Sequence, residues 1–477
     1  MASQSLHHAD EEFRCGVACK RENRLTEAME HYERALALCP DHAQAHNNIG
    51  VLRQEWGQFA LAVAAYQKAI ESRPDFGLSW CNRGNCLRED NRLEEAIACY
   101  RRAQVLMPLD GQTRINLATA LKDLRQFDEA LAVLDEIPSV SPDLPKARIN
   151  RSMIHLLRGE LGQGWDEYEG RLQIEPNPRP IPARRWDGTP LAGRSILLLS
   201  EQGIGDQVMF ASCLPDLLKG AETSAVECDA RLVPMFARSF PQIRSIAKTT
   251  DPAALAPVAG HDVMAYNVVE FMGTLPRFLR RRVEDFPNTD CYLRPDPDLV
   301  VKWRSSLAHL GGALKVGLSW HGGKDAETRR RRSIPLDLWE PIFQVPGVRF
   351  VNLQYGSAAA EASRARQRFG VSLDDGTDCD PLLDLDDFAA KMAALDLVVS
   401  VDNSTAHLAA AIGRPIWALL PFSPDWRWML DRDRTPWYPT MRLLRCRAAD
   451  HWPELLKRVA RQLTSATFSR DLLSGAA

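Results

Sequence analysis

Residues 1–174 carry small and large side chains at fixed positions that recur every 34 residues. Two small series and one large series keep this register, namely Gly16, Gly50, Gly84, Ala118 and Ser152; Ala28, Ala62, Ala96, Ala130 and Gly164; and Tyr32, Tyr66, Tyr100, Leu134 and Tyr168. A small residue lets two antiparallel helices approach, and a large residue one turn later fills the adjoining gap. Prolines at the same period end each second helix. The pattern therefore predicts five helix pairs.

This repeat length and its Trp/Gly/Tyr/Ala/Pro pattern, Trp80 included, resemble the tetratricopeptide repeat. The resemblance implies an all-α solenoid over residues 1–174 that binds a protein or peptide. Because each repeat of a solenoid packs only on its neighbours, a terminal repeat must close the array. The fifth unit departs most from the pattern, and we expect it to cap the array where Trp165 and Tyr168 meet the segment that follows.

Asparagines keep the same period, two positions before the first small series, at Asn48, Asn82, Asn116 and Asn150. In tetratricopeptide repeats this position lines the concave groove. Repeats advance by roughly 10 Å, or about three residues of extended chain at roughly 3.3 Å each. An amide is both donor and acceptor, so the ladder predicts a groove that holds a peptide backbone. Alternatively, the asparagines are simply common at this position of the repeat.

The hydrophobic pattern changes after a proline-rich linker at residues 175–192. Short apolar runs then alternate with helical segments, which is typical of a parallel α/β sheet. The runs at residues 195–200, 315–320, 348–354, 395–401 and 415–420 are predicted strands. We expect two Rossmann-like lobes, residues 193–305 and residues 306–477 with a C-terminal helix, and a ligand in the cleft at the carboxyl ends of the strands.

The clearest candidate for that ligand site is the turn from Asp402 to His407. A buried strand ends at Val401, the chain turns at Asp402 and Asn403, and a helix opens at Ser404 and Thr405. The first amides of a helix lack internal partners and favour an anion such as a diphosphate. Alternatively, Ser404 only caps the helix and His407 packs in the core.

A second basic segment follows the first strand of the same lobe. It runs from Gly322 through Lys324 to Ser333 and contains four consecutive arginines, residues 329–332. Charge runs are usually solvated loops, and we expect at least two of these arginines to be so. Arg332 is nearest the next predicted element and is best placed to bind a phosphate with two hydrogen bonds.

The other lobe contributes a glycine turn and a carboxylate. Gln202, Gly203 and Gly205 follow its first strand, and the glycines permit close backbone approach. Asp206 then falls in the first helical turn, where it interacts favourably with the helix dipole. Its functional alternative is a general base that takes the proton of a substrate hydroxyl.

These segments together resemble the heptosyltransferase-like family 9 glycosyltransferases, and in particular bacterial proteins that join tetratricopeptide repeats to such a domain. The matching motifs are residues 201–207, 332–336 and 402–409, with residues 421–428 and 437–439 typical of the repeat-bearing group. The resemblance implies a GT-B fold, a nucleotide-diphosphate sugar donor, inversion at the anomeric carbon, and no metal or further cofactor. It makes Asp206 the base, puts Arg332 where relatives carry a phosphate-binding lysine, and places Ser404, Thr405 and His407 at the diphosphate.

Three tryptophans, Trp426, Trp428 and Trp437, cluster after the last predicted strand. Their rings are candidates for a platform that stacks on a sugar or acceptor. Alternatively, they pack a C-terminal helix that crosses onto the other lobe.

Composition and charge limit the class of protein and the compartment in which we expect it. The 59 basic and 62 acidic residues give a net charge of -3, which does not suit a nucleic-acid-binding chain. The chain has no apolar run of the roughly 18 to 20 residues that cross a bilayer, and its first residues do not resemble a secretory signal. The 11 scattered cysteines fit a reducing compartment, so we expect a cytoplasmic protein without a membrane span.

Three functions follow as hypotheses. The first is a glycosyltransferase whose repeats hold a protein or peptide acceptor. The second is an enzyme of the same fold that acts on a glycan or lipid-linked sugar. The third is a non-catalytic adaptor that combines the repeats with a degenerate transferase domain.

Overall fold

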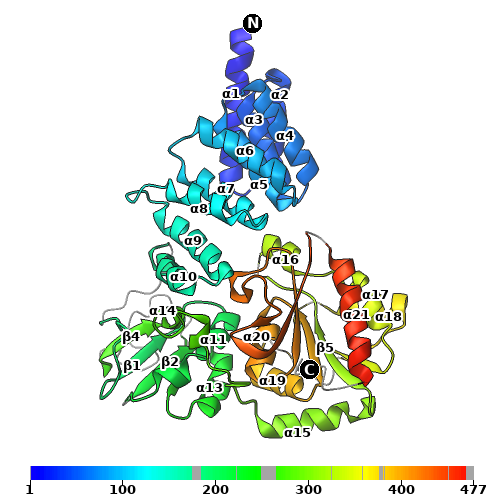
Figure 1. Ribbon diagram of the computed structural model, residues 1–477. Coiled ribbons are helices and arrows are strands. Elements are labelled where there is room, and N and C mark those ends of the chain that lie inside the picture. Colours follow the sequence, from blue (N-terminus) through cyan, green and yellow to red (C-terminus); the bar gives the residue numbers. More distant parts are fainter. Residues whose placement is uncertain are drawn as a thin grey trace. The chain divides into compact units, whose positions relative to one another are not determined.

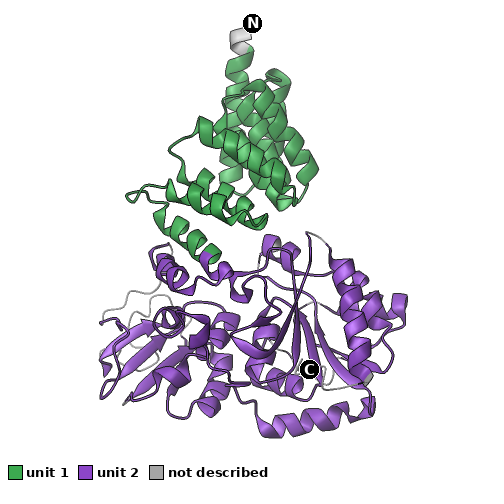
Figure 2. Ribbon diagram, viewed as in Figure 1, with its two compact units in different colours: residues 1–154 green, residues 155–477 purple. Residues whose placement is uncertain are grey.

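The computed structural model of the chain forms two compact units, residues 1–154 and residues 155–477 (Figure 2). It describes residues 2–174, 184–221, 223–248, 265–323, 325–356, 358–374, 380, 382–448 and 451–468.

Unit 1 consists of antiparallel helix pairs, as the 34-residue period predicts. Its helices are α1 (Ala2–Arg21), α2 (Leu25–Leu38), α3 (Ala43–Glu55), α4 (Phe59–Ser72), α5 (Gly77–Glu89), α6 (Leu93–Leu106), α7 (Gly111–Asp123), α8 (Phe127–Asp135) and the first part of α9 (Leu144–Arg158). The glycine series lies where the two helices of a pair touch. A β-carbon at Gly50 would lie only 2.6 Å from the ring of Tyr66, and Gly84 has the same relation to Tyr100. This contact explains why small and large positions recur together.

The fifth repeat straddles the unit boundary, because residue 154 lies within α9. Its second helix, α10 (Leu161–Tyr168), and the 3-10 turn η1 (Glu169–Gln173) belong to unit 2. Trp165 is buried, and its Nε1 donates to the carbonyl of Arg280 at 2.9 Å. Tyr168 packs on Trp426, with ring centroids 5.5 Å apart. Trp165 and Tyr168 therefore meet the following domain, as predicted.

The first α/β lobe contains a four-stranded parallel sheet of order β3-β2-β1-β4 (Figure 1). The strands are β1 (Ile196–Leu199), β2 (Ser224–Cys228), β3 (Arg244–Ala247) and β4 (Val268–Phe271), and the helices are α11 (Ile204–Ala211), α12 (Leu214–Leu217), α13 (Val233–Ser239) and α14 (Leu275–Leu279). The described end of the predicted linker belongs to this lobe, since Trp186 donates its backbone N–H to Val269 at 3.1 Å. Residues 175–183 lie outside the described residues.

The second lobe contains a seven-stranded sheet of order β10-β11-β9-β8-β5-β6-β7, in which only the β10–β11 pair is antiparallel. The strands are β5 (Leu314–Ser319), β6 (Val348–Asn352), β7 (Leu373–Asp374), β8 (Leu397–Val401), β9 (Ile416–Leu420), β10 (Arg434–Thr435) and β11 (Tyr438–Arg445). The apolar runs predicted as strands match β1, β5, β6, β8 and β9. The helices are α15 (Pro297–Ser306), α16 (Ala326–Arg332), α17 (Glu340–Phe343), α18 (Ala359–Phe369), α19 (Leu385–Ala393), α20 (Ser404–Ala411) and α21 (Trp452–Phe468).

The C-terminal helix α21 packs on the second lobe itself. Leu455, Leu456 and Val459 join a buried cluster with alternate residues of β5 and β8. In Figure 1, α21 lies beside α17 and α18, on the far side of the sheet from α19 and α20. The expected helix that crosses onto the other lobe is therefore not formed by the described residues, because the apolar face of α21 is buried against its own sheet.

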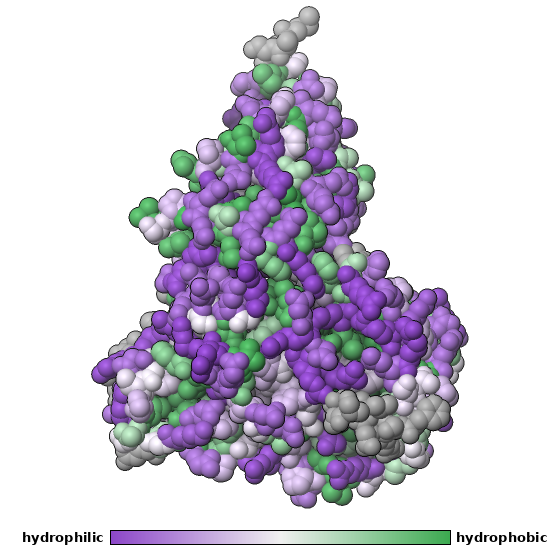
Figure 3. All heavy atoms as spheres, viewed as in Figure 1, coloured by the Kyte–Doolittle hydropathy of each residue, from purple (hydrophilic) through white to green (hydrophobic). Residues whose placement is uncertain are grey.

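Among the described residues, no helix has the length and apolar character that a membrane crossing needs. Hydrophilic side chains cover most of the face shown in Figure 3, and hydrophobic ones are scattered among them.

Candidate functional site

Charged side chains from both lobes of unit 2 meet at the carboxyl ends of four strands. Asp206 follows β1, Arg332 follows β5, Asp402 follows β8, and Asp425 and Arg427 follow β9. Carboxyl ends of parallel strands share one edge of each sheet, where ligands of such folds bind. The structure thus brings the predicted base Asp206 near the predicted phosphate ligand Arg332, with two further residues between them.

These five residues form a continuous chain of ion pairs. Arg332 Nη1 lies 3.2 Å from Asp402 Oδ2, and Arg332 Nη2 lies 2.8 Å from Asp425 Oδ2. Arg427 Nη1 donates to Asp425 Oδ1 at 2.5 Å. Arg427 also donates to Asp206 Oδ1, through Nε at 3.0 Å and through Nη2. Among the described residues, Asp206 Oδ2 has no hydrogen-bond partner.

Burial and charge set the protonation of this ion-pair chain. Burial raises the pKa of Asp402, which Arg332 opposes. The guanidiniums of Arg427 and Arg332 outweigh burial at Asp425 and hold its pKa below the ordinary value. Asp206 and Asp425 raise the pKa of Arg427 against the effect of burial. The cluster therefore contains two guanidinium cations and up to three carboxylates. The positive charge of the guanidiniums is already neutralised by these carboxylates.

The first turn of α20 is capped by Asn403. This residue has extended backbone (φ -156°, ψ -179°), and its Oδ1 accepts from the amide of Ala406 at 3.1 Å. Its Nδ2 donates to Ser319 Oγ at 2.8 Å and to the carbonyl of His321 at 2.9 Å. The alternative that Ser404 caps the helix is wrong, because Asn403 occupies the cap position. The amide of Asn403, expected at the diphosphate, is committed to these bonds.

The first two residues of α20 carry polar groups that the described residues do not engage. No acceptor among the described residues engages the amides of Ser404 and Thr405. The hydroxyl of Thr405 is buried, and the residues that the structure describes give it no hydrogen-bond partner. A buried polar atom without a partner marks a place where a ligand or water is expected.

His407 is a buried, neutral residue. Burial, followed by the positive charge of Arg427, lowers its pKa to about 3. Its Nδ1 lies 2.8 Å from Tyr438 Oη, and its ring stacks on Trp428 with centroids 4.9 Å apart. A β-carbon placed at Gly205 would lie 3.1 Å from Cδ2 of His407. The structure thus places His407 where α11 and α20 touch, which agrees with the packing alternative.

The glycine turn lies close to the N-terminus of α20. Gly203 is the N-cap of α11, and a β-carbon at Gly205 would lie 3.7 Å from Ser404 Cα. Gln202 donates from Nε2 to Tyr168 Oη at 2.6 Å. Its Oε1 is buried and has no partner among the described residues.

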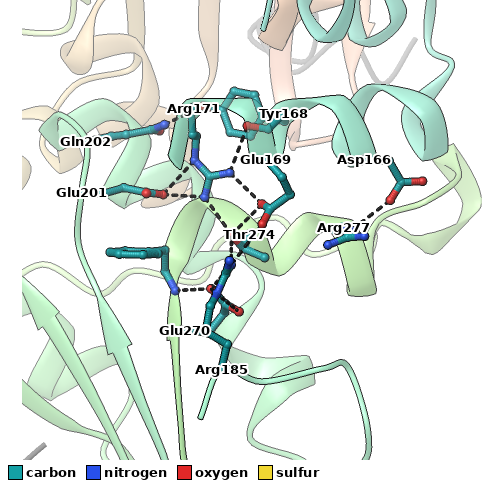
Figure 4. Close-up of polar contacts among 11 residues, drawn as sticks. Asp166, Tyr168, Glu169, Arg171, Arg185, Glu201, Gln202, Glu270, Thr274 and Arg277 are labelled. Atoms are coloured by element: carbon teal, nitrogen blue, oxygen red, sulfur yellow. Dashed lines mark hydrogen bonds and ion pairs between the residues drawn. The ribbon is translucent and has the colours of Figure 1, made fainter. Parts of the chain in front are cut away.

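A buried ion network supports this turn from the side of η1 (Figure 4). Arg171 donates to Glu201 Oε1 at 2.8 Å, to Glu169 Oε1 at 2.8 Å and to Thr274 Oγ1 at 2.8 Å. Burial raises the pKa of Glu201, and Arg171 opposes that shift. Because Glu201 directly precedes Gln202, the network fixes the chain at the start of the glycine turn.

The network continues to a carboxylate within β4. Arg185 Nη2 lies 2.6 Å from Glu270 Oε1 and 3.0 Å from Glu169 Oε2. Sequence reasoning missed this network. Glu270 offered a local signal, since it is a charged residue inside the apolar run Val268–Phe271.

The tryptophan cluster is a packing element. Trp426, Trp428 and Trp437 are at most 4% exposed. Trp426 and Trp437 contact Trp165, with centroids 5.4 Å and 6.1 Å apart. The three buried rings therefore leave no open face for a sugar in this structure. Trp426 and Trp437 pack on the end of the fifth repeat, and Trp428 packs on His407, rather than on α21.

The arginine run forms helix α16 rather than the expected loop, and Asp325 caps it by accepting from Thr328 at 2.8 Å. Arg329, Arg330 and Arg331 are exposed, as predicted for at least two of the four. Lys324 lies outside the described residues.

Asp425 and Arg427 are the site residues that sequence reasoning left without a role. The sequence feature that could have identified them is their position. Both follow a predicted strand at its carboxyl end and lie next to the tryptophans in the sequence.

In unit 1, the four asparagines are half-buried and bond within the array. Asn82 Nδ2 donates to Asn47 Oδ1 at 3.0 Å, and Asn116 Nδ2 donates to Asn85 Oδ1 at 2.9 Å. Asn48 donates to Tyr32 Oη at 3.2 Å, and Asn150 to a backbone carbonyl in its own helix at 2.9 Å. Asn150 also accepts from Thr119 Oγ1 of the preceding repeat at 3.2 Å. All four asparagines therefore link successive repeats, and their role in peptide binding stays a prediction.

Comparisons with known proteins agree with both parts. Residues 16–56 match the TPR repeat model, residues 48–110 the tetratricopeptide repeat model, and residues 349–441 the model of glycosyltransferase family 9 (heptosyltransferase). Protein FlbA of Caulobacter vibrioides is 37% identical over 340 residues, which cover 68% of this chain and 56% of FlbA. The chain thus spans little more than half the length of this curated relative.

Among solved structures, the chain is similar to YrrB, which is described as a TPR protein with an unusual peptide-binding site. The two are 19% identical, and the match covers 35% of this chain and 86% of the YrrB chain, with a TM-score of 0.31. MamA from Desulfovibrio magneticus RS-1 is 14% identical and covers 34% of this chain and 90% of its own, with a TM-score of 0.31. The family matches thus identify tetratricopeptide repeats within residues 16–110 and a segment similar to glycosyltransferase family 9 at residues 349–441, and the latter supports a glycosyltransferase.

Proposed function

We propose that the protein transfers a sugar from a nucleotide-diphosphate sugar to an acceptor hydroxyl on a protein or peptide that the repeats hold. The observation that carries the proposal is the meeting of Asp206 from one lobe with Arg332 and the α20 N-terminus from the other. A base on one side and anion-binding groups on the other are the parts that a glycosyl transfer needs.

Asp206 is the proposed base. One of its oxygens is held by Arg427, which fixes the carboxylate. Oδ2, which no described residue engages, is proposed to accept the proton of the acceptor hydroxyl. The acceptor oxygen then attacks the anomeric carbon from the side opposite the diphosphate, so the sugar is inverted in a single displacement. Fixed charges and dipoles that face the leaving group contribute on the order of several kcal/mol to such a step.

The donor diphosphate is proposed to lie between Arg332 and the first turn of α20. This position is supported by the amides of Ser404 and Thr405 and by the hydroxyl of Thr405, none of which has a partner among the described residues. The protein's own cations and amides then balance the leaving-group charge, without a metal or other cofactor.

The repeats are proposed to present the acceptor. For the asparagine ladder to hold a peptide backbone, bonds such as Asn82 to Asn47 must be exchanged for bonds to the peptide. An amide has further donor and acceptor capacity beyond one such bond, so a peptide can also add to the existing pairs.

Calorimetry of the full chain with UDP, ADP and GDP tests the donor site. Binding of one nucleotide that Arg332→Gln abolishes, while Arg329→Gln on the same helix retains it, is the expected result. Absence of binding by all three nucleotides would contradict the proposal.

A second function, the non-catalytic adaptor, is favoured by one observation. Arg332 is paired with both Asp402 and Asp425, so a diphosphate must displace carboxylates that already satisfy it. An adaptor would bind none of the three nucleotides and would show no transfer, so the same titration separates the two functions.

A further inference from the structure

We propose that Arg427 is a second diphosphate-binding residue, and that the carboxylate of Asp425 occupies the phosphate position between Arg427 and Arg332 until the donor binds. The inference rests on the proposed function and deepens it, because it names where the leaving group goes and which residue links it to the base.

Asp425 is held as a bound anion would be. Its Oδ1 accepts from Arg427 at 2.5 Å, and its Oδ2 lies 2.8 Å from Arg332. A guanidinium matches carboxylate and phosphate oxygens in the same way, through N–H groups in a fixed plane. Two guanidiniums that converge on one carboxylate therefore define a position that a phosphate group can fill.

Arg427 is also preorganised for this role. Its guanidinium lies 4.4 Å from the ring centroid of Trp426, and that ring is buried against Trp165. A guanidinium stacked on a fixed aromatic ring loses little further freedom when it binds an anion. Trp426 thereby gains a function, since it sets the plane of Arg427.

The displacement of Asp425 is chemically reasonable. A diphosphate offers several charged oxygens, which the proposal places against both guanidiniums and the amides of Ser404 and Thr405, two amides that no acceptor among the described residues engages. Charge-assisted bonds to phosphate replace those to Asp425, and the α20 amides add bonds that Asp425 does not make.

Arg427 also connects the leaving group to the base. The acceptor oxygen forms a bond to the anomeric carbon while the bond from that carbon to the diphosphate oxygen breaks. The electron pair of the broken bond stays on the diphosphate oxygen. The acceptor proton moves to Asp206 Oδ2. Protonation neutralises Asp206, so the charge of Arg427 becomes available to the diphosphate as negative charge develops there.

Inorganic pyrophosphate is the probe for the test, because it needs no knowledge of the nucleotide or the sugar. The full chain is titrated by calorimetry as wild type, Arg427→Gln, Arg427→Lys, Asp425→Asn and the matched control Arg329→Gln. We expect both Arg427 variants to bind about ten- to hundredfold more weakly, as for the loss of charge-assisted hydrogen bonds, and Arg329→Gln to bind as wild type does. Asp425→Asn should bind more tightly, by about tenfold.

Thermal unfolding of each variant identifies any that do not fold. If Arg427→Gln does not fold, Arg427→Lys carries the comparison, because lysine keeps the charge but not the planar pair of donors. Unchanged affinity in the folded Arg427 variants, with loss in Arg332→Gln, would overturn the role of Arg427 and leave the proposed function intact. Weaker binding by Asp425→Asn would overturn the role of Asp425 as a stand-in anion. If neither wild type nor Asp425→Asn binds pyrophosphate, the donor site itself is refuted.

Discussion

Arg427 donates from two nitrogens to a single oxygen of Asp206, with Nε at 3.0 Å, although the two residues are 221 positions apart. The bond joins the segment after β9 to the first turn of α11, and so joins the two lobes. It leaves the second oxygen of Asp206 without a partner among the described residues. A carboxylate held at one oxygen and open at the other is suited to accept a proton in a defined direction.

Replacement of Asp206 by asparagine should therefore remove turnover while nucleotide binding is retained. General-base catalysis typically contributes about 10² to 10⁴ in rate, so we expect transfer to fall by at least about a hundredfold. The measurement is transfer from the nucleotide sugar identified by calorimetry, with binding of the nucleotide measured in parallel. Asp298→Asn, at an exposed position on α15, is the control and should behave as wild type. Unchanged turnover in Asp206→Asn would refute the role of base.

The contact between α11 and α20 gives a second prediction. In an open helix, Gly→Ala stabilises by up to about 1 kcal/mol. At Gly205, however, the new β-carbon would lie 3.1 Å from His407 Cδ2. We expect Gly205→Ala to destabilise the second unit by about 1–3 kcal/mol, as overpacking does, and to lower its unfolding temperature.

Gly312→Ala is the matched control for this substitution, because no atom of the described residues would lie within 4 Å of a β-carbon there. Its unfolding temperature should be within error of wild type. A Gly205→Ala protein that is as stable as wild type would show that the two helix ends are not in close contact.

Acid should destabilise the fold through His407. The folded protein keeps this ring neutral, with a pKa lowered to about 3 mainly by burial, whereas an unfolded histidine has a pKa of about 6.5. Between these values the unfolded state takes up a proton that the folded state does not, so stability falls as the pH is lowered from about 6.5 towards 3. Above that window His407 makes no pH-dependent contribution.

Urea unfolding at pH 7.5 and pH 5.0 measures this effect. The contribution of His407 at pH 5.0 is a loss of about 2 kcal/mol relative to pH 7.5. His407→Asn should therefore lose less stability than wild type between the two pH values, whatever its stability at pH 7.5. His8→Asn, at an exposed position, should keep the wild-type difference. An equal pH response of His407→Asn and wild type would exclude a buried neutral histidine.

The sequence predicted the repeats, the main strands and the convergence of Asp206 with Arg332, because these follow from periodicity and from the rule that parallel strands share a carboxyl edge. The predicted start of α20 at Ser404 is correct, whereas the alternative in which Ser404 is the cap was one residue late. Asn403 and Ser404 are both good capping residues, and only the backbone geometry decides between them.

The contacts that sequence reasoning missed join residues that are far apart in the sequence. Arg427 is paired with Asp206, and Arg171 with Glu201 and Thr274, across segments that no local pattern relates. The burial of the tryptophans depends likewise on where Trp165 lies. The composition of a charged or aromatic cluster does not tell whether it faces a ligand or another part of the same chain.

The asparagine ladder gives the last prediction, and it separates a peptide acceptor from a glycan or lipid-linked one. Asn82→Ala together with Asn116→Ala removes two side chains that line the predicted groove and also bond to Asn47 and Asn85. An enzyme that holds a peptide in this groove should then show a raised KM for its peptide acceptor with kcat nearly unchanged, since uniform binding is lost and the chemical step is not. An enzyme that acts on a glycan should keep both parameters. Gln104→Ala, on α6, the second helix of its repeat, is the control, and unfolding of unit 1 followed by circular dichroism shows whether the loss of the two inter-repeat bonds has melted the array. A folded double variant whose KM for a peptide acceptor equals that of wild type would exclude the ladder as the acceptor site.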